Sequence, residues 1–275
     1  MNQKVVFITG ASTGIGYASA QKLLQNGFIV YATARRVELM KGLEEQGAKI
    51  MKCDVTKDED IQNVVDTIIQ NEGRIDVLFA NAGYCLLGPV ELHSSEAVTQ
   101  QFDVNVVGCG RAISAVLPHM RKQKSGRILI TSSAAGHVSM PGMPWYPATK
   151  HAQQGLADGL RMEVKEFGIK VSLIEPGYID TDIDNASLPW LDKAEQHPNA
   201  SAYAHQMKTF REKWSKGIDK GASPETIAKV VLHAASSKKP KRRYHPNMDA
   251  KGAIFMKRWF GYGLLDKAIP AQSIY

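Results

Sequence analysis

The stretch VVFITGASTGIG, residues 5–16, decides the fold of this chain. Its first five residues are apolar or β-branched, which is typical of a buried strand. Three glycines at 10, 14 and 16 follow, and helical sequence begins directly after them. Such a loop lets the backbone approach a dinucleotide pyrophosphate, and the helix N-terminus supplies N–H groups and a positive dipole end. The spacing G-x3-G-x-G is not the standard G-x-G-x-x-G, so a purely structural glycine turn is the alternative.

Short apolar runs recur along the first two-thirds of the chain. They occupy 28–33, 48–53, 76–80, 127–131 and 170–174. Segments with helical spacing separate them, and apolar strands alternating with helices predict a parallel sheet covered on both faces. Right-handed crossovers then give an α/β, doubly wound sheet of the Rossmann type. No internal repeat or low-complexity linker interrupts the sequence, so we expect a single domain over 1–275 with its core at 4–236.

The alternation ends after Ile174. Residues 180–220 mix aromatic, proline and polar residues, which indicates an insertion with some helix that covers a substrate as a lid. Its large apolar residues either line a ligand site or belong to ordinary packing. These residues are Leu188, Trp190, Tyr203 and Trp214. Residues 237–275 then form a C-terminal extension.

The charge of the chain is concentrated in its last fifth. The net charge is +7, and residues 220–275 hold 11 Lys and Arg against 3 Asp and Glu, whereas the first 219 residues hold 23 against 24. No nucleic-acid-binding module accompanies these bases, so we expect no nucleic-acid partner. Contact of the basic extension with an anionic membrane surface or an acidic ligand stays open.

Targeting and metal-binding signals are not found in the sequence. No apolar stretch approaches the ~18 residues that span a bilayer, and the N-terminus lacks the core of a signal peptide, so we expect a cytoplasmic protein. Neither the three cysteines nor the histidines show the spacing of a metal site, so no metal is predicted.

The end of the second apolar run discriminates between two cofactors. An acidic residue there commonly binds the 2′-hydroxyl of the NAD ribose, but this chain has Arg35 and Arg36 instead. Guanidinium groups form paired hydrogen bonds to phosphate, so the two arginines predict NADP(H). The alternative is that one or both are solvated residues at the start of a helix.

Several motifs occur in a fixed order and resemble one family. They are TGASTGIG at 9–16, Asp54-Val55, Asn81-Ala82-Gly83, Asn105, Ser133, Tyr146-x3-Lys150 and Pro176-Gly177. Together they resemble the short-chain dehydrogenase/reductase family over roughly residues 4 to 236. The stretch VYATARR is most similar to the hydroxysteroid-dehydrogenase-like and retinol-dehydrogenase-like branch.

This resemblance implies a catalytic set of four residues. Tyr146 would be the general acid in carbonyl reduction and the base in alcohol oxidation. Lys150 would lower the pKa of that phenol by its charge and bind the nicotinamide ribose. Ser133 would orient the substrate oxygen, with the neighbouring Ser132 as its rival, and Asn105 would bend its helix and hold a water linked to the lysine.

The resemblance also implies a cofactor site and substrate contacts. The substrate would touch Ser133, Tyr146 and His137. We expect a hydrophobic carbonyl compound or secondary alcohol, similar to a steroid, a retinoid or an acyl lipid. The implied cofactor-binding residues are Gly10, Ser12, Thr13, Gly14, Ile15, Gly16, Arg35, Arg36, Asp54, Val55, Asn81, Ala82, Gly83, Tyr146, Lys150, Pro176, Gly177, Ile179 and Thr181.

Three further expectations concern helix geometry, assembly and an alternative role. Pro147 lies between Tyr146 and Lys150 and is tolerated if the helix starts near Trp145. The resemblance implies a homodimer or homotetramer built on the helices near 97–122 and from about 146. The alternative function is a non-enzymatic NADP-binding sensor or scaffold on the same fold, for which loss of the tyrosine, lysine or serine would be the sign.

Overall fold

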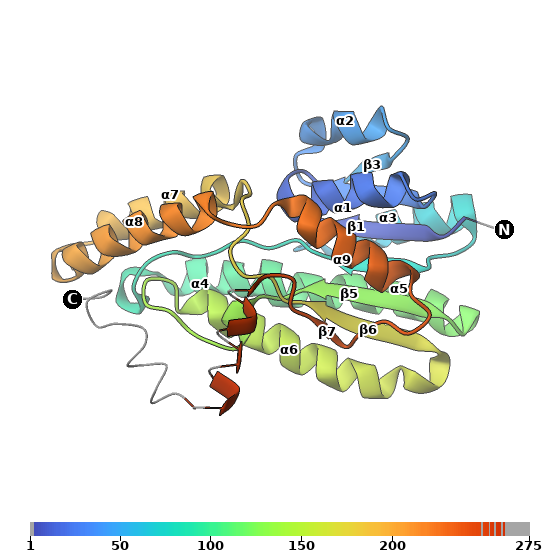
Figure 1. Cartoon of the computed structure of the whole chain (residues 1–275). Helices are drawn as coiled ribbons and strands as arrows, with labels where there is room; N and C mark the ends of the chain where they lie inside the picture. Colours follow the sequence, from blue (N-terminus) through green and yellow to red (C-terminus); the bar gives the residue numbers. More distant parts are fainter. Residues whose placement is uncertain (1–2, 249, 253, 256, 260, 262–275) are drawn as a thin grey trace.

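A computed structural model describes residues 3–248, 250–252, 254–255, 257–259 and 261. Within these residues a seven-stranded sheet forms, in the order β3-β2-β1-β4-β5-β6-β7 (Figure 1). Every neighbouring pair of strands is parallel. The strands are β1 Val5–Thr9, β2 Ile29–Ala34, β3 Lys49–Lys52, β4 Val77–Ala80, β5 Gly126–Thr131, β6 Ile169–Ile174 and β7 Arg243–Tyr244.

Helices follow the strands in alternation, as the sequence predicts. They are α1 Gly14–Leu24, α2 Lys41–Glu44, α3 Asp58–Glu72, α4 Ser95–Phe102, α5 Gly108–Gln123, α6 Trp145–Glu163, α7 Ile183–Glu195, α8 Ala204–Asp219 and α9 Pro224–Ser236. A π-helical turn, Asp103–Val107, joins α4 to α5.

The first strand shows why both faces of the sheet are covered. Val5 and Phe7 belong to one hydrophobic core, together with residues of α3, α5 and α6. Val6 and Ile8 point to the opposite face and belong to a second core, with residues of α1 and α9. Successive side chains of a strand alternate between faces, so an all-apolar strand needs a helical layer on each side. The doubly wound α/β fold is therefore confirmed.

The sheet also contains a strand that the sequence analysis did not predict. Strand β7 lies in the C-terminal extension and pairs with the end of β6 through Leu173↔Arg243 and Ile174↔Tyr244. It is two residues long, so it has no periodicity that a sequence pattern could reveal. The extension thus supplies an edge strand as well as basic residues.

The expected insertion contains two helices. Helices α7 and α8 lie beside the sheet rather than on either of its faces (Figure 1). Helix α9 then returns to the sheet and packs on α1. Among the residues described, no helix has the length and apolar character that crossing a membrane requires.

Candidate active site

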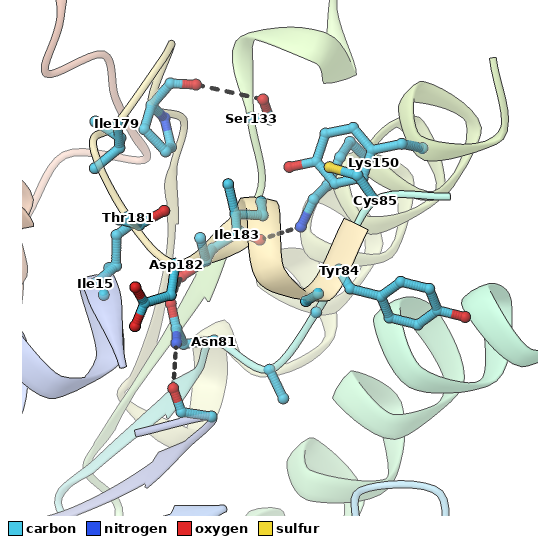
Figure 2. A pocket seen from close by; sticks show the side chains of 18 of the residues that line it. Ile15, Asn81, Tyr84, Cys85, Ser133, Lys150, Ile179, Thr181, Asp182 and Ile183 are labelled. Carbon is cyan, nitrogen blue, oxygen red and sulfur yellow. Dashed lines mark hydrogen bonds between the residues drawn. The ribbon is translucent and has the colours of Figure 1, made fainter. Parts of the chain in front are cut away.

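A cavity of about 460 Å³ lies where strands β1, β2, β4, β5 and β6 end (Figure 2). A cleft at the carboxyl ends of parallel strands is the usual ligand site of such sheets. The structure brings nearly all the predicted cofactor residues together in its walls. Those lining the cavity are Gly10, Ser12, Thr13, Gly14, Ile15, Arg35, Arg36, Asp54, Val55, Asn81, Ala82, Gly83, Tyr146, Lys150, Pro176, Gly177, Ile179 and Thr181.

Gly16 does not line this cavity but is required for the loop to close. A Cβ at this position would lie 2.2 Å from the Gly10 carbonyl oxygen. Gly10 itself has a φ of +68°, in the left-handed region that favours glycine. Asn81 fixes the loop, because its Nδ2 donates to the Gly10 carbonyl oxygen at 3.0 Å. The loop therefore sits at the start of α1, closed tightly enough that position 16 admits only glycine.

The far end of the cavity carries the two arginines. Arg35 and Arg36 follow β2, are exposed and line the cavity. Neither forms a close ion pair within the part of the chain that the structure describes, although the charge of Arg35 acts on Asp54. Asp54 lies nearby, and its pKa is lowered: burial opposes the shift, but hydrogen bonds from Thr56 and the charge of Arg35 outweigh it. Helix α3 begins only at Asp58, so Asp54 does not cap it.

Tyr146 and Lys150 occupy one turn of α6, and both face the cavity. The helix begins at Trp145, so Pro147 lies in the first turn, where its missing N–H has no helical partner to lose. Lys150 Nζ lies 5.3 Å from the centre of the Tyr146 ring. The ammonium donates to the Thr131 carbonyl oxygen at 2.8 Å, which fixes it at the end of β5.

Two neighbouring serines have different partners. Ser133 lines the cavity and forms a hydrogen bond with the Tyr146 phenol that lowers the pKa of that group. The single hydroxyl proton of Ser133 can alternatively be donated to the Pro176 carbonyl oxygen, at 3.3 Å. The Ser132 hydroxyl instead donates to the main-chain oxygen of Lys150 at 3.3 Å. Of the two, Ser133 is the one placed beside the phenol.

Burial is the largest cause of the pKa shifts of Tyr146 and Lys150. It raises the pKa of Tyr146 well above its usual value of 10, and the neighbouring Cys85 adds to the rise. Burial also lowers the pKa of Lys150 to about 8. The direction for Tyr146 is opposite to the one expected from the lysine alone, because burial destabilises the phenolate more than the hydrogen bond from Ser133 stabilises it. The phenol is therefore protonated at neutral pH and the lysine is mostly charged.

Asn105 does not line the cavity but holds Tyr84, which does. It is fully buried in the π-helical turn. Its side chain accepts from Tyr84 N at 3.1 Å and donates to the Tyr84 carbonyl oxygen at 3.0 Å. Its main-chain oxygen accepts from Gln153 Nε2 at 2.6 Å, and Gln153 Oε1 in turn accepts from Lys150 Nζ at 3.0 Å. A buried glutamine thus links Asn105 to Lys150.

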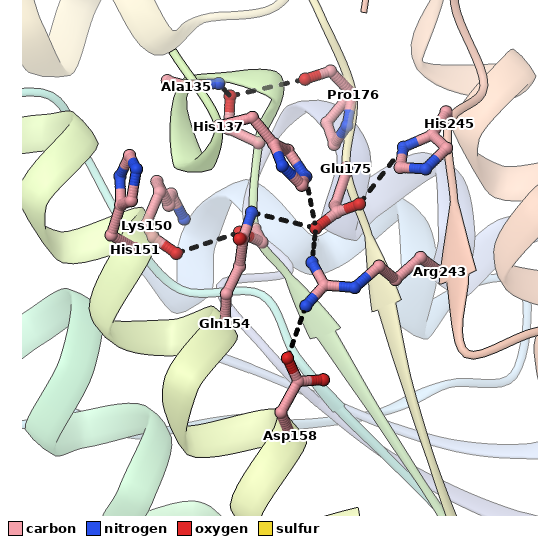
Figure 3. Close-up of polar contacts among 12 residues, drawn as sticks. Ala135, His137, Lys150, His151, Gln154, Asp158, Glu175, Pro176, Arg243 and His245 are labelled. Atoms are coloured by element: carbon pink, nitrogen blue, oxygen red, sulfur yellow. Dashed lines mark hydrogen bonds and ion pairs between the residues drawn. The ribbon is translucent and has the colours of Figure 1, made fainter. Parts of the chain in front are cut away.

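His137 is placed away from the cavity, against a buried carboxylate (Figure 3). Its Nε2 lies 3.1 Å from Oε1 of Glu175, whose side chain has no solvent exposure. Arg243 and His245 reach the same carboxylate, at 2.7 and 3.1 Å. The cluster joins the loop after β5 to the extension and precedes Pro176. It holds the backbone that forms one wall of the cavity.

The segment 180–220, expected to act as a lid, contributes only some of its large apolar residues to the lining of the cavity. Thr181, Asp182, Ile183, Ala186 and Trp214 line the cavity. The other three large residues of this segment do not line the cavity and belong to ordinary packing instead. They are Leu188, Trp190 and Tyr203. Trp190 stacks on Tyr84 with ring centres 6.0 Å apart, and the Tyr203 hydroxyl donates to Glu91 at 2.7 Å.

Sequence reasoning missed two residues of the site. The sequence analysis assigned Cys85 no role, yet it lines the cavity beside Tyr146. Gln153 was not singled out, although its position three residues after Lys150 places it on the same side of a helix. That spacing, with a polar residue on a buried helix face, is the signal that could have found it.

A glycine-rich loop at the first strand–helix junction, joined by one cavity to a buried tyrosine, lysine and serine, defines a dinucleotide-binding oxidoreductase fold. Comparison with known families agrees: the model described as "short chain dehydrogenase" matches residues 4–192. The chain belongs to the short-chain dehydrogenase/reductase family.

Individual relatives show the breadth of that family. The chain is 36% identical to human 17-beta-hydroxysteroid dehydrogenase type 1, over 89% of this chain and 77% of that one. A structure of ElxO with NADP bound is 26% identical, with a TM-score of 0.69 over 89% of this chain and 96% of that one. A Burkholderia phymatum short chain dehydrogenase/reductase in complex with NAD has a TM-score of 0.79 at 22% identity, over 94% and 93%. Its likeness concerns the fold alone.

Proposed function

We propose that this protein is an NADP(H)-dependent oxidoreductase that acts on a carbonyl group or secondary alcohol of a hydrophobic substrate. One observation carries the proposal: Tyr146, Lys150 and Ser133 converge in a cavity that continues to the glycine-rich loop and to Arg35 and Arg36. The cofactor supplies the hydride when bound. The residues of the chain supply binding, orientation and the proton.

The glycine-rich loop and the arginines would hold the cofactor. Backbone N–H groups at the start of α1 suit the pyrophosphate, since no acidic residue lies in the first turn of that helix. The arginines suit a 2′-phosphate because they are charged, exposed and lie at the end of β2 in the lining of the cavity. Asp54 suits the adenine amino group.

Proton transfer falls to Tyr146. Its raised pKa keeps the phenol protonated, so that it can donate to the substrate oxygen when a carbonyl is reduced. Charged Lys150, held by Thr131 and Gln153, then stabilises the phenolate that remains. Ser133 donates a second hydrogen bond to the same oxygen and fixes its position.

The test is a panel of hydrophobic carbonyl compounds, including steroid, retinoid and aliphatic ketones and aldehydes. Each is mixed with the protein and either NADPH or NADH, and loss of the reduced-cofactor absorbance is followed. Reduction with NADPH, and much slower reduction with NADH, is expected. Cofactor binding with no turnover of any compound would favour the non-enzymatic sensor or scaffold instead.

The C-terminal extension supports a peripheral contact with an anionic membrane surface. Met248, Phe255 and Trp259 are 77%, 56% and 69% exposed, and their spacing places them on one side of a helix. Lys251 and Arg258 are exposed nearby. An apolar stripe flanked by bases is typical of a helix that lies on a lipid surface. Sedimentation with anionic vesicles, with and without the substitutions Phe255→Asp and Trp259→Asp, tests this contact and leaves the His245–Glu175 pair in place.

A further inference from the structure

A second cavity, of about 310 Å³, lies next to the catalytic one and is called here the second chamber. The segment 140–146 separates the two: Pro141, Gly142 and Pro144 line the second chamber, whereas Met143 and Tyr146 line the catalytic cavity. The chamber therefore begins directly behind the start of the helix that carries the catalytic tyrosine. No part of the proposed mechanism uses it.

Beside that segment, three side chains form part of the partition between the two cavities. Met140, Tyr178 and Trp214 line both of them. The rings of Tyr178 and Trp214 meet edge to face, with centres 6.3 Å apart, and the Tyr178 hydroxyl lies 3.9 Å from the sulfur of Met140. Methionine is unbranched and adapts its shape readily, so this partition can open by rotation of side chains alone.

The remaining walls of the chamber are apolar. Val90, Leu191, Met207 and Phe210 line it, and Met207 is only 4% exposed. Phe210 lies against Gly142, where a Cβ would come within 2.5 Å of the ring. Apart from the two ring residues of the partition, the polar side chains of the lining are Gln206 and Lys213, both from α8. An apolar cavity with few polar groups suits an apolar ligand.

We propose that the second chamber receives the distal end of an elongated aliphatic substrate whose carbonyl group lies at Tyr146 and Ser133. The inference rests on the proposed function and names the substrate class of the same site. A partition of three side chains admits a thin, flexible chain more readily than a fused ring system. The chamber would then select substrates by chain length rather than by chemistry at the carbonyl.

A series of unbranched methyl ketones, from butanone to methyl decyl ketone, tests this directly. If each added methylene becomes buried, kcat/KM should rise about fourfold per methylene, which is the equivalent of ~0.8 kcal/mol, until the chamber is full. Binding of the same ketones to the protein with NADP present is measured by calorimetry. This second readout is independent of turnover.

Two variants should move the length profile in opposite directions. Met207→Trp fills the chamber without touching the catalytic cavity, so the rise should stop at a shorter ketone while butanone is used as before. Phe210→Ala enlarges the chamber, so the rise should continue to a longer one. Met162→Trp is the matched control, since Met162 is 75% exposed on α6 and lines neither cavity.

The outcomes separate this inference from the proposed function. A length profile that both chamber variants leave unchanged, in turnover and in binding, overturns the chamber. So does a profile that Met162→Trp alters as strongly as Met207→Trp. If long ketones bind with the predicted length dependence but none is reduced, the chamber is supported and the proposed function fails. If Met207→Trp does not fold, Phe210→Ala alone decides the question by the direction of its shift.

Discussion

Replacing Gln153 with leucine should move the pH dependence of turnover. Gln153 Oε1 accepts a hydrogen bond from Lys150 Nζ at 3.0 Å, inside a site where burial lowers the pKa of that lysine to about 8. The folded protein therefore holds the lysine charged below about pH 8 and loses the charge as pH rises. If the phenol needs the charged lysine beside it, kcat for ketone reduction should fall as pH rises through about 8. This fall is the descending limb of the pH profile.

The size of the shift follows from the hydrogen bond that is lost. A neutral amine can still donate, so only the charge-assisted part counts, about 1.5 kcal/mol. This corresponds to about one pKa unit, which would move the limb from about 8 to about 7. At pH 7.5 the charged fraction would fall about threefold, whereas at pH 6 it would fall by only about a tenth.

The assay is kcat for ketone reduction with saturating NADPH, measured from pH 5.5 to pH 9.5. Gln154→Leu is the control: the same substitution one residue later removes a hydrogen bond to Glu175 and none to Lys150. The control should leave the limb near pH 8. A uniform loss of activity at every pH in Gln153→Leu, with no movement of the limb, would refute the reasoning and leave Gln153 a purely structural residue.

Three other predictions follow from the same structure. Arg35→Ala should weaken NADPH binding by about 1.5–3 kcal/mol, roughly 10- to 150-fold, while NADH affinity, measured by the same titration, stays constant. Pro147→Ala should change turnover and the midpoint of thermal unfolding only slightly, because a first-turn proline gives the helix little that alanine lacks; abolished turnover would show that the Tyr146–Lys150 geometry depends on it. Light scattering at micromolar concentration should show a dimer or tetramer, since exposed Val107 lies on the helix expected at the interface, and a monomer alone would contradict this.

The parts of the site that sequence reasoning could locate are those fixed by local rules. The glycines at 10, 14 and 16 need special backbone freedom or close approach, so their spacing reveals the loop. Tyr146 and Lys150 are one helical turn apart, so their relative position follows from the helix alone once Pro147 is placed in its first turn. A strand whose side chains are apolar on both faces is buried on both faces. The apolar runs therefore predicted a sheet with a layer of helices on each side.

The parts that could not be located depend on partners distant in sequence. His137 lies in a loop whose orientation is set by Glu175 and by residues of the extension, roughly a hundred positions further on. Strand β7 exists because the end of β6 offers an open edge, not because two residues prefer to be extended. Trp190 packs on Tyr84 rather than in the cavity, a choice that its own sequence neighbourhood does not encode.

The central claim is that Tyr146 supplies the proton for carbonyl reduction by NADPH. The most direct test compares wild type and Tyr146→Phe with the best carbonyl substrate, measuring both kcat and the dissociation constant of NADPH. The phenylalanine keeps the ring but removes the proton, so kcat should fall by about 10²–10⁴-fold. NADPH affinity should barely change, because under the proposed function the glycine-rich loop and the arginines would make the main cofactor contacts. Near-normal turnover in Tyr146→Phe would contradict the assignment of the proton donor.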